Sequence, residues 1–135
     1  MTRPRQKPIL CLDFDGVIHS YTSGWKGADV IPDPPVPGAL RFIVEAMDHF
    51  ELSIYSSRSG QHGGISAMQE WLSRWFYVDG GEVVDGRAIV GLIQWPTEKP
   101  PAMITIDDRA ITFTGEWPEI NDLLSFKPWN KRNRW

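Results

Sequence analysis

The chain of 135 residues is long enough for one domain with one hydrophobic core and too short for two. Apolar residues make up 41% of it, yet no run approaches the length of a membrane-spanning helix, and residues 9–12 are too few for a signal-peptide core. The single cysteine, Cys11, excludes an internal disulfide. We therefore expect one cytoplasmic domain over residues 1–135, without a membrane segment.

Charge is distributed unevenly along the chain. Residues 1–8 and 127–135 hold seven of the fourteen Lys and Arg and no acid, whereas residues 9–126 hold seven bases against seventeen acids. An acidic body suits a site that concentrates a divalent cation, or simply a solvated surface. The basic ends could contact an anionic partner such as nucleic acid, or be solvated.

The first half of the chain predicts a strand, a flap, a helix and a strand. The nearly continuous apolar run at 9–14 is typical of a buried parallel strand. Residues 16–37 are rich in Gly and Pro without a period, which indicates an irregular flap. A helix starting near Pro37 and a second strand at 52–56 follow. The helix has apolar residues at helical spacing: Leu40, Ile43, Val44 and Met47.

The second half continues the alternation. Ser66 and Gln69 form a capping-box pair ahead of a second helix with apolar positions from Met68 to Phe76. Between residues 77 and 101 the best strand candidate is 88–93, then a buried strand is expected at 102–106 and a short helix near 117–124. This order predicts an α/β fold, a Rossmann-like three-layer sandwich with a central parallel sheet.

Polar residues follow the predicted strands where a parallel sheet binds its ligands. These residues lie at 13 and 15, at 56–58 and at 107–109, with Lys99 upstream of the last strand. Carboxylates, hydroxyls and cations together are what phosphoryl transfer through an aspartyl intermediate needs. A solvated turn is the alternative interpretation of Asp13 and Asp15.

Four motifs in order resemble those of the haloacid dehalogenase-like superfamily. They are Asp13-Phe14-Asp15-Gly16-Val17, the strand-ending Ser56, Lys99, and Asp107-Asp108. Within the superfamily, Ser56-Ser57-Arg58 and Asp107-Asp108-Arg109 are also similar to the phosphatase domain of polynucleotide kinase-phosphatases, a looser likeness.

The resemblance implies a role for each carboxylate. Asp13 would attack phosphorus and bind Mg²⁺, and Asp15 would act as proton carrier while its carbonyl binds the metal. Asp108 is the preferred direct metal ligand, with Asp107 as the second or alternate one. Magnesium is expected because the candidate ligands are hard oxygens and no Cys/His cluster exists in the sequence.

The resemblance also implies roles for the remaining polar residues. Ser56, or Ser57 in the other register, would hydrogen-bond a phosphoryl oxygen, and Arg58 would clamp the phosphate or lie at the surface. Lys99 would stabilise transition-state charge, although a lysine between prolines is also typical of a surface. A lone histidine such as His19 is more often structural than catalytic.

The gaps between the motifs are too short for an inserted cap, so the resemblance implies a capless enzyme. We expect a Mg²⁺-dependent phosphomonoesterase acting on a phosphorylated substrate. The alternatives are a phosphatase of nucleotide or polynucleotide ends, and a non-catalytic phosphate- or nucleic-acid-binding module on the same fold. In the tail at 127–135, Trp129 and Trp135 lie among bases, and we favour their packing on the domain over stacking on nucleobases.

Overall fold

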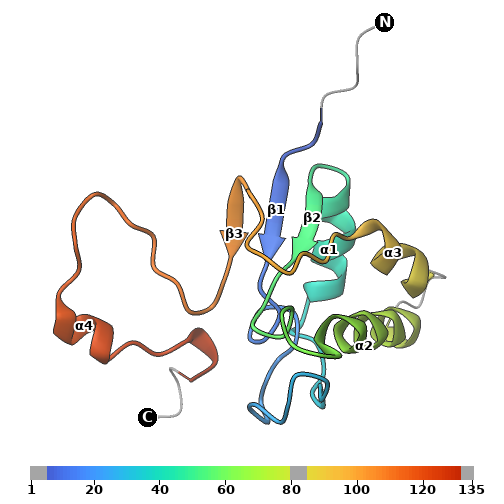
Figure 1. The fold of residues 1–135 in the computed structure, drawn as a ribbon, viewed down its shortest axis with the longest axis horizontal. Coiled ribbons are helices and arrows are strands. Elements are labelled where there is room, and N and C mark those ends of the chain that lie inside the picture. Colours follow the sequence, from blue (N-terminus) through green and yellow to red (C-terminus); the bar gives the residue numbers. More distant parts are fainter. Residues whose placement is uncertain (1–5, 80–84, 132–135) are drawn as a thin grey trace, which may run out of the picture.

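Three short parallel strands form the centre of the molecule, in the order β2-β1-β3. The structure is a computed structural model that describes residues 6–79 and 85–131. The strands are β1 (Ile9–Leu12), β2 (Glu51–Ile54) and β3 (Ile104–Ile106). Leu10 is in register with Leu52 on one side and with Ile104 on the other. The carboxyl ends of all three strands therefore meet at one edge of the sheet (Figure 1).

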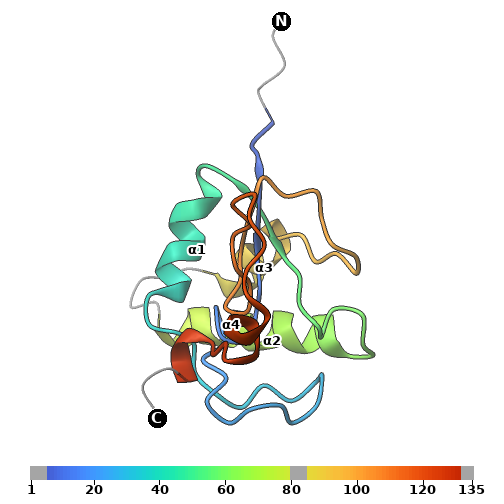
Figure 2. The ribbon, with the colours of Figure 1, turned by 90° about the vertical axis from the view of Figure 1, so that its left-hand side faces the viewer.

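Helices pack around β1 and β2. Helix α1 (Ala39–Met47) lies on one side of the sheet and α2 (Gly64–Asp79) passes below it (Figure 2), while α3 (Gly86–Leu92) lies beyond the β2 edge (Figure 1). The core buries strand residues such as Leu12 and Ile54 against Ile43 of α1 and Leu72 of α2. The predicted α/β class with a central parallel sheet is confirmed at this level.

The predicted strand at 88–93 is wrong, because this segment forms α3. The Asp85 side chain caps the helix by accepting a hydrogen bond from the backbone N–H of Arg87. Strand-like pairing starts only afterwards, where the backbone of Gln94 exchanges hydrogen bonds with Leu52 and Ile54 on the outer edge of β2.

The predicted capping box of α2 is also corrected. The helix begins at Gly64, so Ser66 lies within its first turn and donates to the carbonyl of Gly63. A Cβ at Gly64 would overlap the carbonyl of Arg58, which explains why the chain has no side chain where the helix begins.

The last strand is shorter than expected and is not buried. All three residues of β3 are exposed, with Ile104 at 53% and Ile106 at 39%. After β3, residues 107–126 form an arm that leaves the sheet and carries α4 (Ile120–Leu124) at its far end (Figure 1). The chain returns to the body at the 3₁₀-helix η1 (Trp129–Lys131).

Within the described ranges, no helix is long and apolar enough to cross a membrane. Of the basic ends, Arg3, Arg5, Arg132 and Arg134 lie outside the described residues, and so does Trp135.

Candidate active site

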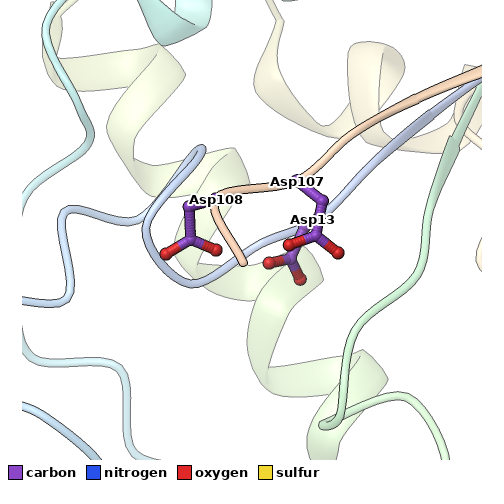
Figure 3. Close-up of side chains that lie close together, drawn as sticks. All are labelled: Asp13, Asp107 and Asp108. Carbon is purple, nitrogen blue, oxygen red and sulfur yellow. The ribbon is translucent and has the colours of Figure 1, made fainter. Parts of the chain in front are cut away.

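Three carboxylates meet at the carboxyl end of the sheet. Asp13 directly follows β1, and Asp107 and Asp108 directly follow β3. The backbone N–H of Asp13 donates to the carbonyl of Ile106 at 3.0 Å, so pairing of the two strands holds the carboxylates together. One oxygen from each of the three lies within 4.8 Å of the others (Figure 3).

Crowding of these acids changes their protonation. Burial, together with the neighbouring Asp107 and Asp108, raises the pKa of Asp13 to about 8, although the backbone N–H of Phe14 opposes this shift. Burial also raises the pKa of Asp108, and a hydrogen bond with Asp13 partly offsets the effect. Both side chains therefore hold a proton more tightly than an isolated carboxyl group when no cation lies between them.

Gly16 makes room for this cluster. Its backbone has a φ of 84°, and a Cβ built on it would overlap the carboxylate of Asp108. The Asp108 side chain is only 3% exposed, and its Oδ1 oxygen has no hydrogen-bond partner in the described chain. A buried carboxylate oxygen without a donor is costly, and a bound cation would satisfy it.

The residues present fit a divalent metal ion. Asp13, Asp107 and Asp108 can hold a cation, and a cation would lower the raised pKa values that their mutual repulsion helps to produce. The donors are carboxylate oxygens, which hard cations prefer. The cluster itself does not distinguish one hard divalent cation from another.

A pocket of about 220 Å³ opens beside the cluster. Its lining residues come from four segments of the chain: Asp13, Asp15, Tyr21, Ser57, Asp108 and Arg109. The pocket joins two members of the metal cluster to a further carboxylate, two hydroxyls and one cation. Such a lining suits a small anion bound next to a metal ion.

Asp15 lies in the pocket wall with fixed partners. His19 donates to it from Nδ1 at 2.9 Å, because the other ring nitrogen accepts the backbone N–H of Asp33. Arg58 pairs with both of its oxygens at 2.9–3.2 Å. Burial would raise the pKa of Asp15, but the hydrogen bonds from His19 and Arg58 outweigh it and hold the pKa below its usual range.

Arg58 is fully buried and fastens the flap to Asp15. Its Nη1 donates to the carbonyls of Gly27, Ala28 and Val30, and the ring of Trp25 lies 4.7 Å from its guanidinium carbon. All of these groups belong to the predicted flap at 16–37. Arg58 therefore lies behind the pocket wall, with its donors directed at Asp15 and the flap.

The two serines after β2 lie in different environments. Ser56 is buried, and its Oγ accepts the backbone N–H of Arg58 at 3.0 Å, which closes the turn. Ser57 instead lines the pocket. Lys99 is exposed in the loop before β3 and is not among the residues that line this pocket.

The sequence patterns assign no individual role to two pocket residues, although they include Arg109 in the strand-end set at 107–109. Arg109 is 61% exposed, and its Nε lies 4.0 Å from an Asp108 oxygen. Its position right after the Asp107-Asp108 pair was a usable signal. Tyr21 lies in the flap with a positive φ of 61°, and no pattern in the sequence marks it.

Comparisons with protein-family models, curated proteins and solved structures found no match to this chain.

Proposed function

We propose that the chain is a Mg²⁺-dependent phosphomonoesterase of the haloacid dehalogenase-like type, without a cap domain. The observation that carries this proposal is the cluster of Asp13, Asp107 and Asp108 beside a pocket that also contains Asp15. The four ordered sequence motifs support the same function, since their acidic members are the residues that meet at the sheet edge.

Asp13 is the nucleophile in this proposal. It lies in both the metal cluster and the pocket wall, so one oxygen can face the cation while the other faces phosphorus. Asp13, Asp107 and Asp108 would hold Mg²⁺ together with the carbonyl of Asp15, and the bound ion would neutralise charge on the nucleophile and the phosphoryl group. Attack forms the Asp13–phosphorus bond as the ester oxygen leaves.

Asp15 is the general acid and general base in this proposal. Its lowered pKa makes it an acceptor at neutral pH, which suits removal of a proton from the water that hydrolyses the aspartyl-phosphate. Protonating the leaving oxygen in the first step requires Asp15 to carry a proton, and the pair with Arg58 opposes this. Substrate binding must therefore loosen the contact between Asp15 and Arg58.

The phosphoryl oxygens have donors in the pocket. Arg109 supplies the positive charge, and Ser57 and Tyr21 supply hydroxyl groups. Lys99, which the resemblance marks as the cation of the site, lies outside this pocket, and its role stays a prediction. Replacing Lys99 and Arg109 separately by methionine would show which cation the reaction needs.

The experiment that tests the proposal is a hydrolysis assay on a broad panel of phosphoesters with Mg²⁺. The panel includes small phosphomonoesters and oligonucleotides with 3′- or 5′-phosphates, which covers the phosphate-end alternative. Asp13→Asn should abolish turnover of every substrate while the circular dichroism spectrum is kept, because an amide is a poor nucleophile. EDTA should silence the wild type reversibly. Activity of Asp13→Asn within tenfold of wild type would refute the mechanism, and no hydrolysis at all would favour the binding-module alternative.

A further inference from the structure

One side of β3 has no helix over it. Helix α1 covers β1 and β2, while β3 forms the edge of the sheet and its isoleucines are exposed (Figures 1 and 2). In an α/β fold, an apolar strand face is normally buried by a helix. In this chain, no helix covers that face of β3 among the described residues.

An apolar groove of about 260 Å³ marks the open place between α1 and β3. Its lining includes Val17, Pro37, Phe42, Ile43 and Ile106. Phe42 and Ile106 line it while remaining 42% and 39% exposed. Side chains of this size in a groove gain free energy when an apolar partner displaces water from them.

The arm at 107–126 presents the complementary surface. Its apolar side chains project without cover, with Ile120 at 69% and Leu124 at 79% exposure in α4. Both ends of the arm are fixed to the body. It leaves from Asp107 at the end of β3, and it returns where the indole N–H of Trp129 donates to the carbonyl of Gly16 at 2.8 Å. The tip with α4 is therefore held away from the groove of its own chain (Figure 1).

The exposed surface is large enough for a stable dimer. The chain exposes 9701 Å², whereas a compact monomer of 15.4 kDa exposes about 7,200 Å². A standard interface buries about 800 Å² per partner. The excess is larger than one partner's share of such an interface.

We propose that the protein forms a two-fold symmetric dimer in which α4 of each copy fills the groove between α1 and β3 of the other. One chain carries both halves of the contact, so in the two-fold arrangement each copy fills the groove of the other and the assembly closes. The partner's α4 supplies the helix that β3 lacks. This inference is independent of the proposed catalytic activity.

The oligomeric state tests the proposal directly. Light scattering coupled to size exclusion should give twice the chain mass for the wild type. Leu124→Glu and Phe42→Glu should each shift the protein to monomer by at least tenfold in dissociation constant, because a buried charge on either side disrupts the contact. Leu92→Glu is the matched control, because Leu92 is 67% exposed on α3 and does not line the groove. This variant should remain dimeric.

Cross-linking between different copies identifies the occupant of the groove. A Phe42→Cys chain is mixed with a Leu124→Cys chain and treated with a short bismaleimide, with wild type as the blank because Cys11 is buried. A covalent heterodimer supports the proposal. The double variant Phe42→Cys/Leu124→Cys at high dilution tests whether α4 instead fills the groove of its own chain, because the link would then form within one chain. Three outcomes would overturn the proposed dimer. They are a monomeric wild type, a link that forms only within one chain, and dimers that survive both glutamate substitutions.

Discussion

Arg58 grips Asp15 by two parallel contacts, Nε to Oδ2 at 2.9 Å and Nη2 to Oδ1 at 3.1 Å, and so joins the turn after β2 to the turn after β1. The same guanidinium holds the flap through three backbone carbonyls. One buried side chain thus positions the proton carrier of the proposed reaction and the segment that overlies it.

Replacing Arg58 should lower the stability of the fold far more than replacing an exposed cation of the pocket. We expect Arg58→Gln to lower the free energy of unfolding by about 3–5 kcal/mol. The substitution removes the cation paired with Asp15, which keeps the hydrogen bond from His19, and it removes the donor to three flap carbonyls. Arg109→Gln is the control: this side chain is 61% exposed, and its loss should raise KM while stability changes by less than about 0.5 kcal/mol. Urea unfolding and steady-state kinetics measure both. Equal stability of the two variants would contradict the clamp.

The acid cluster should make stability depend on pH and metal. The pKa of Asp13 is raised to about 8 in the folded chain and is about 3.9 when unfolded. The unfolded state therefore loses its proton first, and the stabilising contribution of protonated Asp13, complete below about pH 4, declines until about pH 8. Without metal, the melting temperature should fall over this window, and Asp13→Asn should flatten the fall.

Added Mg²⁺ should reverse that loss, since it binds the charged carboxylates of the folded state only. At pH 8 we expect millimolar Mg²⁺ to raise the melting temperature of the wild type by several degrees and that of Asp108→Asn by far less. Differential scanning fluorimetry gives this readout without any substrate. A rise of the same size in Asp108→Asn would remove Asp108 from the metal site.

A fourth prediction concerns the close approach of Gly16 to Asp108. Gly16→Ala should destabilise the chain and weaken the Mg²⁺ response, because the new methyl group would occupy the position of the Asp108 carboxylate. Gly38→Ala matches it in backbone strain, with φ of 85° against 84°, but its Cβ meets nothing within 4 Å. The difference between their melting temperatures isolates the contact. A Mg²⁺ response that is equal in the two variants would show that Gly16 does not shape the site.

Hydrophobic spacing was sufficient to predict several elements. The apolar residues of α1 recur at helical spacing, and Leu40 and Ile43 are buried as expected, whereas Val44 of the same predicted face is 39% exposed. The run before Asp13 forms the central strand, and the parallel order brings Asp13, Asp107 and Asp108 together as the strand-end argument predicts. Local patterns succeed here because burial of one helix face gives apolar residues at helical spacing, and burial of both strand faces gives a continuous apolar run.

Features that depend on distant parts of the chain were not predictable. The short apolar run at 88–93 suits a strand or a helix equally, and in the structure it packs against α2 as a helix that Asp85 caps. β3 is exposed because no helix of the described chain covers it, and the residues of the strand itself do not indicate this. Likewise, nothing near Arg58 in the sequence shows that its partners are carbonyls 28–31 residues away.

The last prediction concerns the anchor of the tail. Trp129 donates its indole N–H to the carbonyl of Gly16, which supports the expected packing on the domain, although the ring is 49% exposed. Trp129→Phe should lower the free energy of unfolding by about 1 kcal/mol, because the ring stays while the hydrogen bond is lost. Trp117→Phe is the control, since Trp117 is 86% exposed, and it should change stability by less than about 0.5 kcal/mol. Urea unfolding distinguishes them. Unchanged stability of Trp129→Phe, combined with a selective and salt-sensitive loss of binding to phosphorylated oligonucleotides, would favour the nucleobase-stacking role instead.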